Sequence, residues 1–171
     1  MFAPALLGAV ANQGGEIPEA FVALQSTGFG SDAASGTFTS AGSAEAWTKF
    51  QDLLVISYAR SAVAGTSPGG ITIRINAASS VYRLQYLYGN DTTAAAAWET
   101  NDGARMGATA RAGWTANTFG GARAYLSDIN SGKWKVVTGT GGVADASRGD
   151  VSQITAIHEN TAAITSLLIM D

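Results

Sequence analysis

Apolar and polar residues alternate along most of this chain, and glycine-rich turns separate the alternating segments. A period of two places successive side chains on opposite faces of a strand, so these segments predict strands with one buried face. In GITIRINAASSVYRLQYLYG, for example, Ile71, Ile73 and Ile75 share one face. The predicted strands are 21–25, 37–40, 53–60, 71–76, 81–88, 122–126, 134–138, 151–158 and 164–170.

Many short strands joined by turns indicate an all-β fold, an antiparallel β-sandwich that is jelly-roll-like, with at most one or two short helices. The alanines of TTAAAAWET at 92–100 favour one short helix, with Thr92 or Thr93 as its N-cap. A single helical turn is also expected within SAEAWTKF at 43–50. The continuous apolar run that opens segment 53–60 is typical of a central strand covered on both faces.

The composition predicts one folded domain with a sizeable core, because 46% of the 171 residues are hydrophobic. Residues 21–171 contain no linker or composition break, and we expect them to form a single β-sandwich domain. Residues 1–20 are apolar but begin without the positive stretch of a signal peptide, so either an apolar N-terminal arm or a first strand is expected. No apolar run reaches the ~18 residues that span a bilayer, so no membrane partner is expected.

The charge content is low, at 13% of residues against ~25% in an ordinary globular domain. Together with the 21 glycines, this deficit indicates that much of the surface is buried against neighbours, as in a subunit of a large assembly, or that the protein is secreted. The net charge is −3 and the Lys and Arg residues are scattered, so no nucleic-acid partner is expected. The absence of cysteine excludes disulfides, zinc–thiolate sites and thiol catalysis.

No catalytic, cofactor-binding or metal-ligating residue is predicted. His158 is the sole histidine, and with Glu159 and Asn160 it fits a surface turn better than a Ser-His-Asp triad. GTGG at 139–142 lacks the lysine of a phosphate-binding loop, and no E-x-D-x-x-E strand provides the carboxylate pair of a glycoside hydrolase. The dispersed acids give no metal cluster, and a calcium site in the loop 145–150 is disfavoured. These acids are Asp32, Asp52, Asp91, Asp102, Asp128, Asp145 and Asp150.

Two weaker signals concern recognition. The tripeptide RGD at 148–150 matches integrin ligands, but a polar turn is the expected reading of so short a match. The four tryptophans offer aromatic faces on which a sugar ring can stack, although positions in the core or in an interface are favoured for most of them. These tryptophans are Trp47, Trp98, Trp114 and Trp134.

Three segments carry a resemblance to a known family. They are FTSAGSAEAWTKFQDLLVISYARS at 38–61, ITIRINAASSVYRLQYLYG at 71–89 and NTAAITSLLI at 160–169. In this order they resemble small virion proteins of tailed bacteriophages of the marine and freshwater type, and the resemblance covers roughly residues 21–171. It implies a β-sandwich or jelly-roll domain on a head, tail or fibre, located at the outer surface of the virion.

The resemblance implies a non-enzymatic structural protein without a cofactor, most plainly a capsid decoration or cement protein. Its expected partners are other copies of itself, with a trimer favoured, and a major capsid or tail protein. The alternative is a tail-associated or fibre module that recognises a host-surface glycan.

The sequence departs from the family pattern at two places. Family members continue past the closing strand, whereas this sequence ends at ITSLLIMD, so an uncovered sheet edge is expected near 164–170. The turn SDINSGKWK at 127–135 stands where the family has a different hairpin. For the polar face of segment 70–89, we expect Arg74, Asn76 and Arg83 to bond across strands, to the turn 77–80 or to an adjacent subunit.

Overall fold

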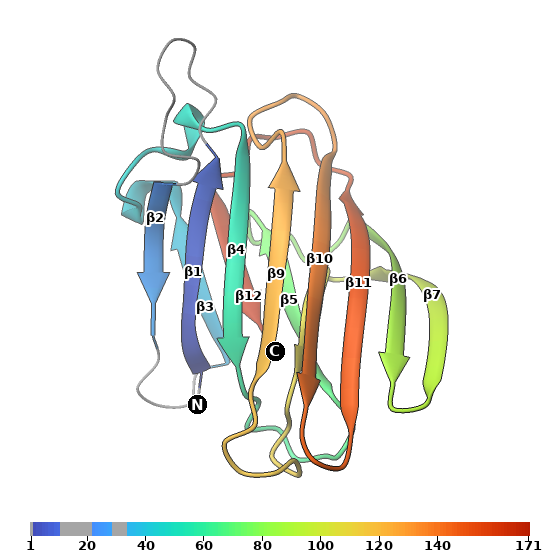
Figure 1. The fold of residues 1–171 in the computed structure, drawn as a ribbon. Helices are drawn as coiled ribbons and strands as arrows, with labels where there is room; N and C mark the ends of the chain where they lie inside the picture. Colours follow the sequence, from blue (N-terminus) through green and yellow to red (C-terminus); the bar gives the residue numbers. More distant parts are fainter. Residues whose placement is uncertain (1, 11–21, 29–33) are drawn as a thin grey trace.

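A computed structural model describes residues 2–10, 22–28 and 34–171, the first of these ranges by its backbone alone. Two antiparallel sheets pack face to face, as the sequence predicted (Figure 1). In order across the larger sheet, its strands are β2 (Val22–Thr27), β1 (Phe2–Val10), β4 (Asp52–Ala59), β9 (Gly120–Ser127), β10 (Lys135–Ala144), β11 (Gly149–His158), β6 (Tyr82–Asn90) and β7 (Thr93–Asn101). The smaller sheet has the order β3 (Ser35–Thr39), β12 (Ser166–Met170), β5 (Gly69–Ile75) and β8 (Ala104–Thr109).

The topology is that of a jelly roll with two added pairs of strands in the larger sheet. From β3 onward the chain alternates between the sheets, except that β6 and β7, and then β9, β10 and β11, stay in the larger one. Without strands β1 and β2 and the hairpin β10–β11, the orders β4-β9-β6-β7 and β3-β12-β5-β8 are the two four-stranded sheets of a jelly roll. The described helices are two 3-10 turns, η1 (Ser40–Gly42) and η2 (Trp47–Lys49), and neither has the length or apolar character needed to cross a membrane.

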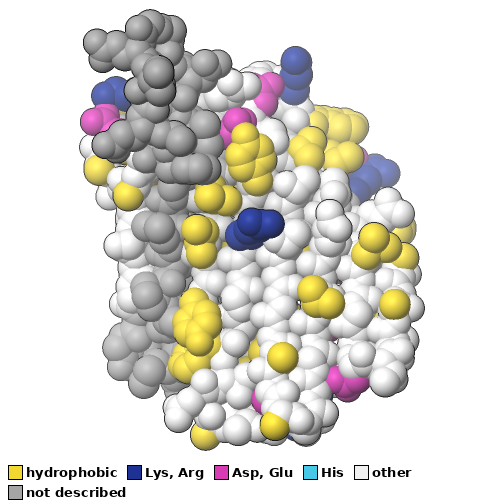
Figure 2. Space-filling view, viewed as in Figure 1, with side chains coloured by type: hydrophobic (Ala, Val, Ile, Leu, Met, Phe, Trp, Pro, Cys, Tyr) yellow, Lys and Arg dark blue, Asp and Glu magenta, His cyan; other side chains and the backbone are white. Residues whose placement is uncertain are grey.

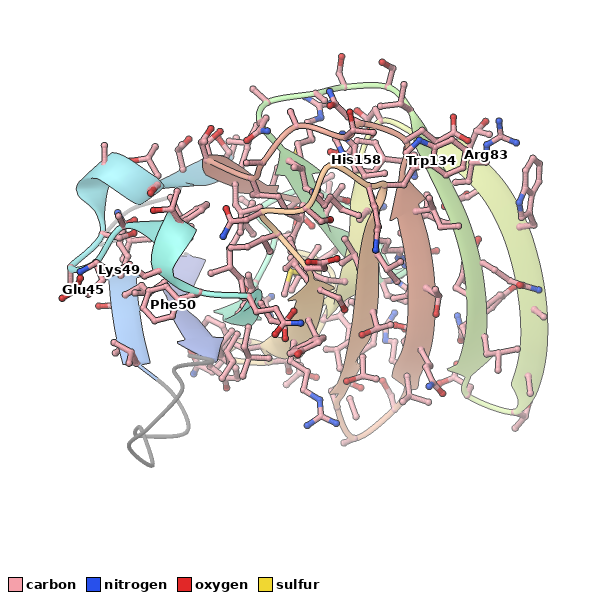
Figure 3. All side chains as sticks on the ribbon, turned by 90° about the horizontal axis from the view of Figure 1, so that it is seen from above. Glu45, Lys49, Phe50, Arg83, Trp134 and His158 are labelled. Carbon is pink, nitrogen blue, oxygen red and sulfur yellow. The ribbon has the colours of Figure 1, made fainter. Side chains whose placement is uncertain are left out.

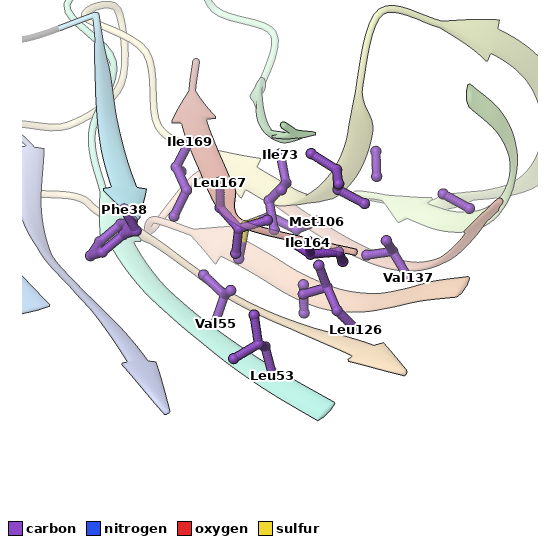
Figure 4. Packing of buried hydrophobic residues seen from close by; sticks show 14 of the residues in the cluster. Phe38, Leu53, Val55, Ile73, Met106, Leu126, Val137, Ile164, Leu167 and Ile169 are labelled. Atoms are coloured by element: carbon purple, nitrogen blue, oxygen red, sulfur yellow. The ribbon is translucent and has the colours of Figure 1, made fainter. Parts of the chain in front are cut away.

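The core lies between the sheets and is built from alternate residues of nearly every strand (Figure 4). Ile71, Ile73 and Ile75 are fully buried, as the period of two predicted. They meet Leu53 and Val55 from the larger sheet within one hydrophobic cluster. Each such side chain contributes about 1.5–3 kcal/mol when it leaves water, so this cluster is the main source of stability.

The two sheets touch backbone to backbone where β8 crosses β9 and β10. A Cβ atom added at Gly107 would lie 2.5 Å from the Cβ of Ala122, and one added at Gly139 would lie 2.9 Å from the Cα of Met106. Such distances leave no room for a side chain, so these glycines allow the sheets to approach more closely than the ~10 Å spacing of ordinary packed sheets.

Three predictions about local structure were wrong. The segment 92–100 forms strand β7 rather than a helix, because a two-residue loop with Asp91 at a φ of 49° folds it back on β6 in continuous register. The closing strand β12 is not a sheet edge, since it lies between β3 and β5. Strand β4 is central but is covered on one face only, because Ile56 and Tyr58 are 42% and 51% exposed.

Residues 1–20 were expected to form an arm or a first strand. Phe2–Val10 form strand β1, which pairs with β2 and β4, whereas residues 11–20 lie outside the described part of the chain.

Replacing Gly107 with Ala is expected to lower the free energy of unfolding by about 1–3 kcal/mol, because the added methyl group overpacks the contact between the sheets. Chemical denaturation measures this loss. Gly121→Ala is the matched control, since a Cβ there would meet no atom within 4 Å. Equal stability of the two variants would contradict the close contact.

Candidate functional site

Most of the exposed large apolar side chains lie on the outward face of the eight-stranded sheet. Ten such side chains are exposed among the described residues, and seven belong to strands of this sheet. They are Ile56, Tyr58, Leu87, Trp98, Val136, Val151 and Ile157. Two more, Val81 and Trp134, directly precede β6 and β10, and Val63 lies in the loop after β4. We call the outward face of strands β4, β9, β10, β11, β6 and β7 the open face.

Backbone pairing aligns the open face into rungs, each a row of residues paired across successive strands. One rung is Tyr58, Gly121, Gly142, Val151, Gly89 and Ala94. The neighbouring rung on the same face is Ile56, Arg123, Thr140, Gln153, Leu87 and Ala96. Together they line most of an open groove of about 1090 Å³. Because three members of the first rung are glycines, backbone forms part of the groove floor, and side chains of another molecule can approach it closely.

Charged groups on the open face are few (Figure 2). Several of them bond to neighbours within the same surface. Arg123 Nε donates a hydrogen bond of 2.9 Å to Thr140 Oγ1, and Arg83 forms an ion pair with Glu159. At one end of the face, the hydroxyl of Tyr125 donates to the carboxylate of Asp52, and this bond raises the pKa of Tyr125 to about 12. Covering such a surface with another protein has a small desolvation cost, because few charged groups on it are left without a partner.

His158 lies buried at the end of β11 and not in a surface turn, so this expectation was wrong (Figure 3). It stands between Lys135 and Tyr82 in the pairing of β10, β11 and β6. Its ring centroid lies 4.7 Å from that of Tyr82, and neither ring nitrogen has a hydrogen-bond partner among the described residues. Burial, and secondly the charge of Lys135, lowers the pKa of His158. The imidazole is therefore kept neutral and has no paired nucleophile or acid.

The acids named from the sequence do not converge. Within the described ranges, no group of three or more His, Asp or Glu side chains could hold a metal ion, and Asp32 falls outside those ranges. Asp145 instead accepts hydrogen bonds from the backbone of Ser147 and Arg148 and from Thr115. The bond from the Ser147 backbone contributes most to holding the pKa of Asp145 well below its usual range. Its carboxylate thus holds a turn together.

Three more of these acids, Asp52, Asp91 and Asp102, bond to partners within the chain. Asp52 accepts a bond from the backbone of Asp128, which itself adopts a left-handed φ of 55° in the turn after β9. Asp91 accepts from the backbone N–H of Gly149, and Asp102 pairs with Arg74. These contacts stabilise turns and strand ends.

The RGD tripeptide is not presented as a ligand. The guanidinium of Arg148 lies 4.9 Å from the ring centroid of Trp114 and donates to the carbonyl oxygen of Thr66 at 2.8 Å. Asp150 is only 8% exposed, and burial raises the pKa of its carboxyl group. A receptor would have to unfold this strand end to reach both side chains.

The four tryptophans divide into two pairs. Trp47 and Trp114 are buried and donate their indole N–H groups to Ser43 and to the carbonyl oxygen of Thr66. Trp98 and Trp134 are 63% and 57% exposed, on β7 and just before β10. The sequence alone did not separate these pairs, since indole rings suit both a core and an interface.

The polar residues of segment 70–89 find partners within the chain. Arg74 Nε donates to the carbonyl oxygen of Asp102 at 2.9 Å and its guanidinium pairs with the Asp102 carboxylate. Asn76 joins the closing segment of the chain, because its Nδ2 donates to Ala163 and its Oδ1 accepts from Thr165 and Ser166. Arg83 faces the solvent on the open face, where it pairs with Glu159.

Comparison of the chain with protein-family models, with curated proteins and with solved structures found no match.

The stability of the protein is expected to fall as the pH drops below about 6.5, the pKa of an unperturbed histidine. The lowered pKa of His158 means that the unfolded chain binds a proton that the folded chain refuses, so folding loses up to about 1.4 kcal/mol per pH unit in this window. Thermal unfolding between pH 7 and pH 5 measures the effect. His158→Phe should flatten the profile, and a profile identical to that of the wild type would contradict it.

Removing the side chain of Asn76 is expected to destabilise the fold by about 2–3 kcal/mol, because backbone groups of residues 163–166 lose their partner. Asn76→Asp retains both acceptor bonds and loses the donor, so its loss should be smaller. Denaturant unfolding of both variants provides the measurement, and equal losses would argue against the acceptor role.

Proposed function

We propose that this protein is a non-enzymatic structural subunit of a tailed-phage virion, a decoration or cement protein on the outer surface of the head. Its partners are then the major capsid protein or a tail protein and further copies of itself. The proposal joins the family resemblance of the sequence to one structural observation, the open face.

The open face supports a role in assembly because of what gathers on it. Seven large apolar side chains and a glycine-lined groove occupy it, and its charged residues Arg123 and Arg83 bond to Thr140 and Glu159 of the same surface. Large exposed apolar patches on soluble proteins mark contacts with other proteins or with ligands. Ile56 and Tyr58 of β4 are 42% and 51% exposed, so a partner that covers this face would remove their apolar surface from water.

The size of the face also suits a protein interface. Six strands ~4.8 Å apart and eight to ten residues long span roughly 24 by 30 Å, or ~700 Å² before side-chain relief is counted. A stable interface buries ~800 Å² on each partner. The open face therefore supplies most of one interface, and repetition over a capsid lattice multiplies its contribution.

A second candidate function is recognition of a host-surface glycan. The exposed indoles of Trp98 and Trp134 favour it, since aromatic rings stack on sugar rings. Sub-millimolar binding of one saccharide on a glycan array, lost in Trp98→Ala or Trp134→Ala, would support this function over cementing.

The number of copies per particle and the heat resistance of particles test the proposal directly. Particles lacking the protein should release DNA at a lower temperature than wild-type particles, and added protein should restore the difference. Hundreds of copies per particle are expected on a head. Tens of copies or fewer, or unchanged release of DNA, would overturn the cement role.

Val151→Glu is expected to reduce attachment to particles by about tenfold or more, because attachment would then bury an unpaired carboxylate in the groove. Val151 is 63% exposed, so the fold should tolerate the change. Val63→Glu, at a 55% exposed position away from the open face, is the matched control. Sedimentation of particles with bound protein measures attachment, and equal attachment of the two variants would exclude the open face as the contact.

A further inference from the structure

Strand β7 forms one edge of the larger sheet, and within the described ranges it pairs with β6 alone (Figure 1). It has nine residues, against six in β2 and in β8 and five in β3, the other edge strands. Every residue of β7 is exposed or half-buried, whereas β8 is mostly buried. β7 is thus the longest and most accessible edge of the described sheets.

Several of the devices that normally prevent pairing at an edge are missing from β7. Its sequence, TAAAAWETN, contains no proline and no lysine, and its pairing with β6 continues without a bulge from Thr93 to Asn101. An edge of this kind presents a row of free backbone N–H and C=O groups to any second strand. Four consecutive alanines add little that would obstruct such a strand.

We propose that β7 pairs antiparallel with the β7 of a second copy of this chain, about a two-fold axis at Ala97. Ala97 is the midpoint of the strand, so this register pairs all nine residues with their counterparts. A shift in either direction leaves residues unpaired at both ends. The join would link two eight-stranded sheets into one continuous sheet.

The register at Ala97 also brings together exposed apolar groups. Trp98 then lies opposite Ala96 of the second copy, whose neighbour across β6 is Leu87. Neighbouring strands are ~4.8 Å apart, so the indole reaches over the small alanine toward that leucine. Trp98 and Leu87 are 63% and 58% exposed in the single chain, and the two-fold axis duplicates this contact.

Electrostatics permit the same arrangement. Glu99 is the sole charged residue of β7, and in this register it lies opposite Ala95 of the second copy. The two Glu99 carboxylates therefore do not face each other, and no pair of like charges stands across the join. The strand is complementary to itself, which favours a second copy over a different partner.

The mass of the purified protein in analytical ultracentrifugation tests the pairing. The wild type is expected at an even multiple of the chain mass. Ala97→Glu places two carboxylates face to face across the axis and should halve that mass, with a dissociation constant raised about tenfold or more. Ala97→Lys should act in the same way, and an equimolar mixture of the two variants should restore the wild-type mass.

Two further variants make the result independent of folding defects at Ala97. Ala95→Lys sets a lysine opposite Glu99 of the second copy and should tighten the association about threefold, in a salt-sensitive manner. Ala23→Glu, at an exposed alanine of β2 on the other edge of the same sheet, should leave the mass unchanged. Thermal unfolding verifies that each variant is folded.

A monomeric or trimeric wild type, or a mass insensitive to Ala97→Glu in a folded variant, would overturn the pairing. Dissociation by Ala23→Glu would likewise overturn it in favour of the β2 edge. The pairing is independent of the virion proposal, because it is measured on the purified chain. Protein that is monomeric yet stabilises particles would refute the pairing alone.

Discussion

The eight-stranded sheet has twice as many strands as the sheet that packs against it, and this mismatch determines what the rest of the molecule presents. Side chains of a strand alternate between two faces, so the larger sheet must send half of them away from the core. The smaller sheet covers one face of the larger sheet, and the described chain has no layer over the other. The apolar side chains of the outward face and the unpaired edge at β7 therefore both lie outside the core.

Small residues adapt both sides of the larger sheet to this arrangement. On the inner side, Gly107 and Gly139 allow the two sheets to meet backbone to backbone, so β8 can lie directly on β9 and β10. On the outer side, Gly121 and Gly142 leave backbone at the floor of the groove. The glycines that the sequence shows in its turns are therefore only part of the total, and those inside the strands set how closely other groups approach the sheet.

The period of two predicted nine strands, each of which overlaps a strand of the structure, and the antiparallel sandwich itself. It failed where local propensity and tertiary pairing disagree. The alanines of β7 favour a helix when considered alone, and pairing with β6 overrides them. His158 seemed a surface residue because polar neighbours follow it, but the strand register places it between Lys135 and Tyr82 inside the sandwich. The low charge content of the sequence indicated that the surface carries few charges. The location of the open face could not be predicted without the register of six strands.

The open face and the β7 edge would contribute different interactions to the proposed assembly. Burial of apolar side chains on the face is non-directional and scales with area, so by itself it holds neighbours together without fixing their orientation. Backbone pairing at an edge contributes fewer buried groups but fixes direction and register, because a slip of one residue exchanges the two faces of the added strand. In the register centred on Ala97, the outward face of one copy continues into that of the next, with Trp98 and Leu87 at the seam. Edge pairing would then double the area of open face that a single partner can contact.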